Sequence, residues 1–250
     1  MLHDDLVRAL DPVEFSRRIG LEPDPWQAEV LRYEGKRLLL NCSRQSGKST
    51  TTATKGLHTA IYRPKSLILL VSPSLRQSQE LFRKVKEGYE AMEARPGLLE
   101  DNKLSMTLTN GSRIISLPSD QSTVWGFSGV TMILEDEAAQ VKDEFYYAIL
   151  PMLIINNGVF IAMTTPYGRR GHFFTEWENG GDDWKRVEIP ATKCPRISPA
   201  DLERQRRSLG SMFFRQEFCC EFVETVDQVF GYDMVQGAFD DNIKPLFGGE

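Results

Sequence analysis

The part of the sequence that most constrains the fold is a short, mostly apolar run, 37–42, followed by a turn ending in Gly47 and a helix-length stretch, 48–62. Backbone N–H groups in such a turn converge on phosphate oxygens, and the positive end of the helix dipole strengthens the attraction. Gly47 permits close approach of the backbone, Lys48 can reach the β- and γ-phosphates, and the Ser49 hydroxyl can ligate Mg²⁺. The sequence therefore predicts a strand, a phosphate-binding loop and a helix.

The turn departs from the strict phosphate-loop pattern, G-x-x-x-x-G-K-[ST], at one position. Cys42 stands where the first glycine belongs, and a side chain this small is tolerable there. The alternative is a glycine-containing turn that merely precedes a lysine. The apolar run before the turn and the helical stretch after it favour the phosphate loop.

A second apolar run, 130–134, leads into three consecutive acidic residues. Hydrolysis at a phosphate loop needs a carboxylate for Mg²⁺ and a residue that orients the attacking water. We predict Asp136 as the metal ligand and Glu137 as the residue that orients the water. A shift of one residue would make Glu135 and Asp136 the working pair instead. A third alternative is an exposed strand end whose acids have no catalytic role.

The remaining apolar runs alternate with helical stretches. Strands are predicted at 37–42, 66–72, 130–134 and 158–164, and helices at 48–62, 74–92 and 142–153. Asn110-Gly111, between alternating apolar residues at 104–108 and 115–117, is typical of a β-hairpin. This rhythm predicts an α/β fold, a mostly parallel sheet flanked by helices.

The two ends of the chain have a different character. Residues 1–22 form a predicted helical lead-in, and a helix is expected from Pro25 to about Arg32. Two amphipathic helices, 199–208 and 211–223, are predicted after the last strand. We therefore expect a core domain over 1–190 and a small helical lid subdomain over 191–250.

Composition excludes several classes of protein. The chain has 250 residues, of which 41% are hydrophobic and 26% charged, enough to bury a sizeable core. The longest apolar run, 148–155, is broken by Pro151 and is too short to span a membrane. The four cysteines include the adjacent Cys219 and Cys220, which do not suit a disulfide framework. The three histidines are scattered, so no metal cluster is expected.

The charge balance offers no global attraction for nucleic acid. Thirty Lys and Arg against 35 Asp and Glu leave a formal net charge of −5, so any such contact must be local. Candidate basic patches are 83–86, 169–170 and 204–207. They would neutralise phosphates without reading sequence, and a solvated helix face is the alternative interpretation of each.

Trp26 and Gln27 precede the phosphate loop, and Gln27 lies about twenty residues before Lys48. A Gln amide donates and accepts hydrogen bonds at once, as the N6/N7 edge of adenine requires, and Trp26 can pack nearby. Trp26 as a simple core residue is the alternative. In this position the pair resembles the Q motif of helicase-like ATPases.

Taken in order, these segments resemble the ATPase domain of a tailed-phage large terminase, the motor that drives DNA into a procapsid. The resemblance rests on the loop SRQSGKS, the acidic strand with 136–139, the segment TTPYGRRGHFF at 164–174 and the run FRQEFCCEF at 214–222. It implies a P-loop NTPase core of the RecA/ASCE type that hydrolyses ATP with Mg²⁺.

The resemblance also implies roles for individual residues. Thr164 and Thr165 correspond to the family's coupling motif, and Arg44 to its loop arginine, which contacts the γ-phosphate or links to the lid. Glu137, Lys48 and Arg44 are the expected catalytic residues, and Ser49 and Asp136 the expected Mg²⁺ ligands. The nucleotide is expected to contact Trp26, Gln27, Ser43, Arg44, Gln45, Ser46, Gly47, Lys48, Ser49, Thr50, Thr164 and Thr165.

Similar terminases carry an arginine before the acidic strand that reaches into the neighbouring subunit. This chain has Trp125 there, and Arg113, Arg169 or Arg170 are possible substitutes. Loss of such an arginine slows hydrolysis by orders of magnitude. The expected two-metal nuclease domain of a full large terminase is not recognisable in this sequence.

The resemblance further implies double-stranded DNA, a portal protein and a small terminase subunit as partners, a homo-oligomeric ring, and no membrane. The expected location is the cytoplasm of the infected bacterial host, with transient docking on the procapsid. Two alternatives stay open: a helicase-like DNA-stimulated ATPase, and a nucleotide-gated assembly module with little turnover.

Overall fold

The computed structural model describes residues 2–119, 126–224, 234 and 237 of the chain. Within them, one sheet of eight strands has the order β3-β4-β5-β2-β6-β7-β1-β8. From β5 to β8 all neighbours pair parallel, whereas β3, β4 and β5 pair antiparallel. The strands are β1 (Arg37–Cys42), β2 (Leu67–Ser72), β3 (Leu98–Asp101), β4 (Ser105–Leu108), β5 (Arg113–Pro118), β6 (Met132–Asp136), β7 (Val159–Thr164) and β8 (Trp184–Ile189). The predicted α/β class with a mostly parallel sheet is confirmed.

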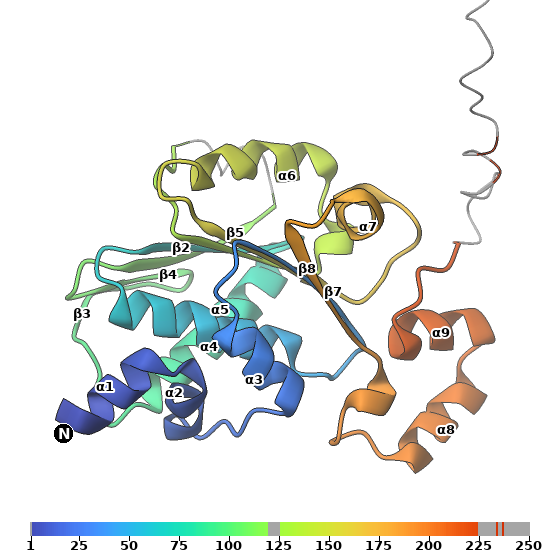
Figure 1. The fold of residues 1–250 in the computed structure, drawn as a ribbon, viewed down its shortest axis with the longest axis horizontal. Helices are drawn as coiled ribbons and strands as arrows, with labels where there is room; N and C mark the ends of the chain where they lie inside the picture. The colour runs from blue at the N-terminus through green and yellow to red at the C-terminus, as the bar shows by residue number, and fades with distance from the viewer. Residues whose placement is uncertain (1, 120–125, 225–233, 235–236, 238–250) are drawn as a thin grey trace, which may run out of the picture.

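Helices cover both faces of this sheet (Figure 1). On one face lie α1 (Leu2–Leu10), α2 (Pro12–Arg18), α3 (Pro25–Arg32), α4 (Lys48–Tyr62) and α5 (Leu75–Glu90). On the other lie α6 (Asp143–Ile149) and α7 (Gly171–Asn179). The short helices α8 (Pro199–Ser208) and α9 (Ser211–Cys219) lie beyond β1 and β8.

Each central strand supplies both halves of the core. Leu38 and Leu40 of β1 join the cluster under α4 and α5, whereas Leu39 joins the cluster under α6 and α7. Successive side chains of a strand point to opposite faces, so a strand buried on both sides must be apolar at nearly every position. The continuous apolar runs in the sequence reflect this double burial.

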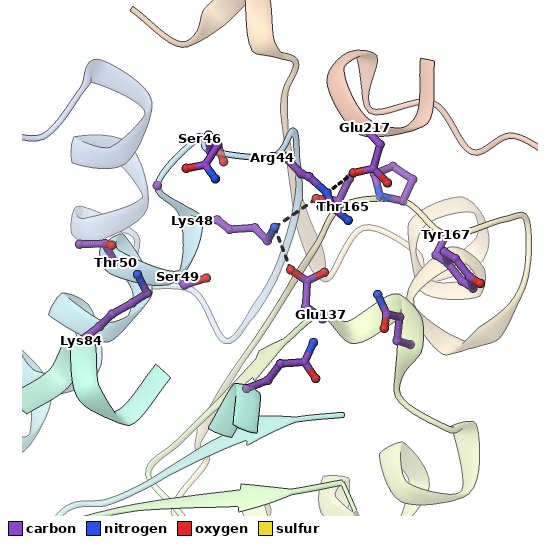
Figure 2. Close-up of a pocket in the computed structure, with 15 residues that line it drawn as sticks. Arg44, Ser46, Lys48, Ser49, Thr50, Lys84, Glu137, Thr165, Tyr167 and Glu217 are labelled. Carbon is purple, nitrogen blue, oxygen red and sulfur yellow. Dashed lines mark hydrogen bonds and ion pairs between the residues drawn. The ribbon is translucent and has the colours of Figure 1, made fainter. Parts of the chain in front are cut away.

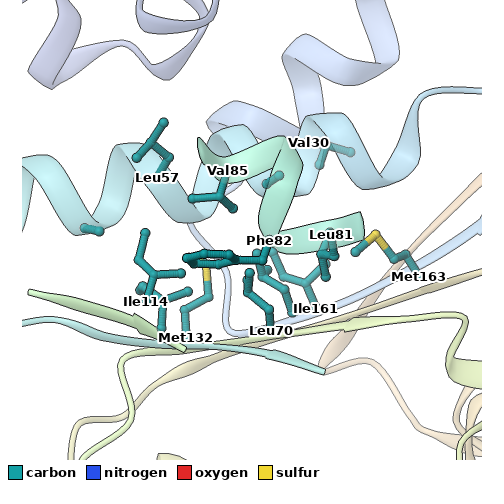
Figure 3. Close-up of a cluster of buried hydrophobic side chains, with 14 of the residues drawn as sticks. Val30, Leu57, Leu70, Leu81, Phe82, Val85, Ile114, Met132, Ile161 and Met163 are labelled. Atoms are coloured by element: carbon teal, nitrogen blue, oxygen red, sulfur yellow. The ribbon is translucent and has the colours of Figure 1, made fainter. Parts of the chain in front are cut away.

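The larger cluster forms where α5 lies across the sheet (Figure 3). Leu81, Phe82 and Val85 of this helix pack with Leu70 of β2 and Met132 of β6. Their positions in α5 are spaced by one, three and four residues, so they share one face of the helix. Ser74 caps its first turn by accepting a hydrogen bond from the Gln77 N–H at 3.4 Å.

Most predicted elements are present with small changes of boundary, and the hairpin at Asn110-Gly111 joins β4 to β5. The predicted strand 130–134 instead runs from Met132 to Asp136, so two of the acids belong to β6 itself. The stretch 142–153 divides into α6 and a 3₁₀ turn containing Pro151, because proline lacks the N–H that continues an α-helix. The helix 211–223 ends at Cys219, since Cys220 adopts a left-handed backbone with φ 62°.

Two strands and one α-helix were not predicted: β3, β8 and α7. Both strands lie at the edges of the sheet, where only part of the strand is buried and no continuous apolar run is required. Lys185 and Glu188 of β8 are exposed. Helix α7 begins directly after the turn at Gly168, and its first turn buries His172 and Phe173.

Within the described residues, no helix is long and apolar enough to cross a bilayer. All four cysteines are free. The same part of the chain holds no cluster of three or more His, Cys, Asp or Glu side chains that suits a metal ion.

The packing of α5 provides a matched test of the core. Leu81 is 1% exposed and Leu75, on the same helix, is 50% exposed. We expect Leu81→Ala to lower the free energy of unfolding by roughly 2–5 kcal/mol, because it removes buried methyl groups and leaves a cavity. Leu75→Ala should change it by less than about 0.5 kcal/mol. Denaturant titration of both variants measures the difference, and equal losses would contradict this placement of α5.

Candidate functional site

A pocket of about 530 Å³ lies where β1, β6 and β7 end (Figure 2). Parallel strands present their carboxyl ends at one edge of a sheet, and ligands of open α/β proteins bind there. Its wall includes every residue from Arg44 to Thr50, together with Glu137 and Thr165. The structure thus gathers residues from three predicted segments around one cavity.

The loop after β1 has the backbone that a phosphate site needs. Gly47 has φ 93°, a left-handed backbone that favours glycine, and a Cβ there would lie 2.7 Å from Gln27 Nε2, so a larger residue would also displace that amide. Helix α4 begins at Lys48, and its first amides have no partners within the helix. Cys42, in place of the pattern's first glycine, is fully buried in the core and leaves the loop unobstructed.

Lys48 is buried at the centre of the site. Its Nζ lies 3.2 Å from Glu137 Oε1 and donates to Thr165 Oγ1 at 3.1 Å. Burial disfavours the ammonium charge, but the carboxylates of Glu137 and Asp136 outweigh that effect and raise the pKa of Lys48. The side chain therefore joins the end of β6 to the end of β7 as a cation (Figure 2).

Ser49 and Asp136 make the second contact between the loop and β6. Ser49 Oγ donates to Asp136 Oδ2 at 2.8 Å. Burial first, and the neighbouring Glu137 charge second, raise the pKa of Asp136 to about 6. A divalent cation would compensate this buried charge, and hydroxyl and carboxylate oxygens are the donors that Mg²⁺ prefers. The two residues fit the predicted metal site.

Glu137 has an unusual backbone. It adopts the left-handed conformation with φ 53° and ψ 43°, which costs about 1–2 kcal/mol for a residue with a Cβ. Its N–H donates to Asp136 Oδ1 at 3.0 Å, and the N–H of Ala139 donates to Thr164 Oγ1 at 3.3 Å. These bonds hold the turn after β6 so that the Glu137 carboxylate faces Lys48.

The predicted coupling residues connect the three strand ends. Thr165 Oγ1 accepts from Lys48 and donates to the carbonyl of Cys42 at 3.1 Å. Thr164 Oγ1 donates to the carbonyl of Thr165 at 2.7 Å. A displacement of Lys48 would therefore disturb the end of β7 directly.

Arg44 links the phosphate loop to helix α9. Its guanidinium forms an ion pair with Glu217, and its backbone N–H donates to the Glu217 carbonyl at 3.0 Å. The side chain is 67% exposed, so it is free to turn toward a ligand. The observed contact of Arg44 is therefore with helix α9.

Three predicted contact residues lie behind the pocket rather than in its wall. Trp26 packs in the core under α4 and α5, which corrects its expected contact with a base. Ser43 is fully buried, and its N–H donates to the carbonyl of Ile189. Thr164 is also fully buried, and its hydroxyl serves the turn after Glu137. All three support the wall and do not reach the cavity.

Gln27 borders a smaller cavity of about 270 Å³ on the other side of the loop, together with Gly47 and Thr50. Its Oε1 accepts from the N–H of Asp24 at 2.8 Å, while Nε2 lies 3.5 Å from the carbonyl of Ser46. The amide is thus oriented by the start of α3, beside the phosphate loop. Gln27 thus lies beside the phosphate loop, as the sequence predicts.

Glu135 lies on the opposite face of the sheet, fully buried against His172 of α7. A site built on Glu135 and Asp136 is therefore excluded by strand geometry, because adjacent residues of β6 face opposite ways. Asp136 and Glu137 are the acids that reach the pocket side.

Several residues around the two cavities were not predicted to line a nucleotide site; among them are Gln77, Lys84, Tyr167, Arg196 and Glu217. The seven-residue spacing of Gln77 and Lys84, two turns of helix α5, was the only available signal for them. Arg196 Nη2 donates to the Ser46 carbonyl at 2.6 Å, and Nη1 lies 2.8 Å from Asp24 Oδ2. Nothing local to Arg196 in the sequence indicated this contact.

Residues of each predicted basic patch differ in the groups that they contact. Arg83 pairs with Glu80 and Glu87, whereas Lys86 pairs with Asp101. Lys84 lines the larger pocket, and its Nζ also lies 3.9 Å from Glu80 Oε1.

At the other two patches, Arg204 and Arg207 each pair with an acid of α8. Arg170 lies over the ring of Tyr167, 5.3 Å from its centre. Arg113, at the start of β5, lies at the opposite edge of the sheet from the pocket. Trp125 is outside the described residues.

Comparison with known proteins agrees with this geometry. Residues 39–236 match the family described as terminase large subunit, T4likevirus-type, N-terminal. The large terminase subunit of Thermus virus P23-45 is 24% identical, over 89% of this chain and 53% of its own length. That of Escherichia phage T5 is 27% identical, over 75% of this chain and 44% of its own. The chain spans about half the length of these relatives.

Solved structures share the fold. The large terminase ATPase domain of Thermus phage P74-26 superimposes with a TM-score of 0.72 at 20% identity, covering 84% of this chain and 98% of that one. The large terminase of another thermophilic bacteriophage, solved with ATP-gamma-S, gives 0.66 at 13% identity, covering 80% and 52%. Since the family match extends over most of the sequence, from β1 to beyond α9, this chain belongs to the terminase large subunit family and corresponds to its N-terminal part.

Proposed function

We propose that this chain is the Mg²⁺-dependent ATP-hydrolysing motor domain of a large terminase subunit, which drives double-stranded DNA into a procapsid. The observation that carries the proposal is the set of contacts among Lys48, Glu137, Ser49 and Asp136, contributed by the phosphate loop with the start of α4 and by the end of β6. The thermophilic-phage terminase solved with ATP-gamma-S has the same fold, which supports a nucleotide as the ligand.

In the proposed reaction, the first amides of α4 and the Lys48 ammonium bind the β- and γ-phosphates. Phosphate oxygens compete with Glu137 for Lys48, and this competition frees the Glu137 carboxylate to orient the attacking water. Ser49 and Asp136 would hold Mg²⁺, which neutralises charge developing on the phosphates. Arg44 would contribute a further positive charge on leaving Glu217.

The coupling role proposed for Thr164 and Thr165 follows from the same contacts. Thr165 bonds both Lys48 and the Cys42 carbonyl, and Thr164 bonds the turn after Glu137. When Lys48 follows the γ-phosphate, these hydroxyls exchange partners. The end of β7 and the loop after it then respond to the state of the nucleotide.

We propose that 1–190 form the ATPase core and that 191–250 form the lid and the start of a linker. The contacts of Arg44 with Glu217 and of Arg196 with Ser46 join the lid segment to the phosphate loop. DNA, a portal protein, a small terminase subunit and further copies of the chain in a ring are the proposed partners, in the host cytoplasm. With a net charge of −5, the chain would bind DNA through limited basic surfaces rather than a global field.

The role of Glu137 can be tested by Glu137→Gln. The amide keeps the size of the side chain but cannot accept a proton from the attacking water, so we expect hydrolysis to fall at least about 100-fold. ATP binding should persist, because Lys48 loses only a competing partner. Single-turnover hydrolysis and fluorescent-nucleotide titration measure the two effects. Glu93→Gln, at an exposed position, is the matched control, and normal turnover by Glu137→Gln would rule out this role.

The metal site can be tested by Ser49→Ala. Removing the hydroxyl deletes one oxygen donor and the bond to Asp136, and we expect about tenfold or more Mg²⁺ for half-maximal hydrolysis. Hydrolysis measured across a Mg²⁺ titration checks this. Ser208→Ala, at an exposed position on α8, is the control. An unchanged Mg²⁺ requirement would show that Ser49 is not a ligand.

The packaging role predicts that duplex DNA stimulates hydrolysis independently of sequence. Backbone contacts release counterions, so we expect the stimulation to fall steeply as salt rises. ATPase assays with two unrelated duplexes and with single strands at several salt concentrations check this. Preference for single strands would favour a helicase-like ATPase. ATP binding without turnover, even with DNA and procapsids, would favour a nucleotide-gated assembly module.

A further inference from the structure

A buried carboxylate–imidazole pair lies on the face of the sheet opposite α4 and the pocket. His172 Nε2 is 2.8 Å from Glu135 Oε2, and the two side chains are 2% and 0% exposed. Glu135 belongs to β6, immediately before Asp136, while His172 lies in the first turn of α7, at the end of the loop that follows β7. The pair therefore joins β6 to α7, the helix that follows Thr164 and Thr165 in the chain.

Strand geometry separates this pair from the pocket. Along β6, Met132 and Leu134 pack in the cluster under α4 and α5, and Ile133 packs in the cluster under α6 and α7. By the same alternation, Asp136 faces α4, where it bonds Ser49, and Glu135 faces α7. One strand end thus carries a carboxylate for each face, and any shift of Glu135 along the strand would also move Asp136.

The surroundings of His172 favour its charged form. Burial alone would lower the pKa of His172, but the carboxylates of Glu135 and Asp143 together raise it above its ordinary value. Asp143 Oδ1 lies 3.5 Å from Nδ1 and accepts the His172 backbone N–H at 2.6 Å. The ring stacks on Tyr146 at 4.3 Å, and Tyr146 Oη donates to Glu176 at 3.0 Å.

Stability does not account for this arrangement. Removing two charges from water costs several kcal/mol per ion, and apolar residues of similar size in their place are often equally stable. Position 135 lies in a strand buried on both faces, where an apolar side chain would satisfy packing. Moreover, Glu135 Oε1 has no hydrogen-bond partner among the described residues, so the pair is not optimised as a structural bridge.

The loop between β7 and α7 is consequently held at both ends. At one end, Thr165 contacts Lys48 and Thr164 contacts the turn after Glu137. At the other end, His172 is bonded to Glu135 on the far side of β6. Glu137 lies between these two anchors in a left-handed backbone conformation, which neighbouring contacts must maintain.

We propose that Glu135 and His172 are positioning residues that fasten the end of β6 to α7 and thereby hold Glu137 in place for hydrolysis. The pair transmits displacement of the loop after β7 to the strand that carries Asp136. This inference rests on the proposed ATPase function, and it assigns the pair no contact with the nucleotide.

The first test is the apolar double variant Glu135→Leu/His172→Phe, which leaves no buried charge and keeps a ring against Tyr146. We expect its melting temperature to stay within a few degrees of wild type and its affinity for ATP-gamma-S within about twofold. Single-turnover hydrolysis should fall at least tenfold, because Glu137 is no longer fastened. A wild-type rate in the folded double variant would overturn the proposal.

The conservative variant His172→Gln tests whether the hydrogen bond to Glu135 alone is enough to maintain hydrolysis. Its amide Nε2 can donate to Glu135 Oε2 as the imidazole does, so we expect a rate within about threefold of wild type. His58→Phe is the matched histidine control: this partly buried ring contacts Phe15 and Tyr62 on the other face of the sheet, and its loss should leave the rate unchanged. A rate for His172→Gln as low as that of the apolar pair would contradict positioning through this hydrogen bond.

Hydrogen exchange separates failure of the inference from failure of the proposed function. In the wild type, ATP-gamma-S in place of ADP should change protection in both the phosphate loop and 165–171. In the apolar double variant the change at 165–171 should shrink at least twofold while that of the phosphate loop persists. An undiminished change would overturn the link even if no variant hydrolyses ATP.

Absence of wild-type hydrolysis would count against the proposed function alone. If the apolar pair does not fold, Glu135→Gln/His172→Leu removes the link without leaving a buried charge. The same outcomes then decide the proposal.

Discussion

The site depends on one buried cation. Lys48 lies where the phosphate loop, β6 and β7 meet, and its ammonium contacts Glu137 and Thr165. In a region with so little water, an unpaired charge would be costly, so each of these partners also stabilises the fold. A ligand that draws Lys48 away changes the electrostatic balance of all three segments at once. The proposed link between nucleotide binding and motion therefore depends on the contacts of the Lys48 ammonium.

Successive side chains of β6 point to opposite faces of the sheet, so the strand that carries Asp136 also has contacts on the far face. Asp136 bonds Ser49 on one face, and Glu135 bonds His172 on the other. Because Glu135 and Asp136 are consecutive residues of one strand, a shift of the end of β6 would move both contacts together. The segment after β8 contacts the phosphate loop separately, through the pairs Arg44–Glu217 and Arg196–Ser46. Through these contacts the phosphate loop is connected to β6, and through β6 to α7, as well as to the segment after β8.

The sequence was most informative where the candidate site is built from residues close together in the chain. The loop ending in Gly47 and the acids after an apolar run are recognisable because each depends on spacing within a few residues. The central strands were predictable because burial on both faces requires continuous apolar runs. The edge strand β8 is half exposed and shows no such run, and α7 begins after a turn with little helical signal. Trp26 was ambiguous because core packing and base contact favour the same residue type.

By itself the sequence determined the fold class, the phosphate loop and the set of acids from which the site is built, since these follow from short-range patterns of burial and turn chemistry. Only the tertiary structure decided which acid faces the pocket, that Arg44 meets Glu217, and that Lys84, but neither Arg83 nor Lys86, lines the larger cavity. It also decided that Glu135 belongs with His172. These partners lie far apart in the chain or on different faces of one strand. Their meeting depends on strand order and on the orientation of α5, α7 and α9, which no local pattern encodes.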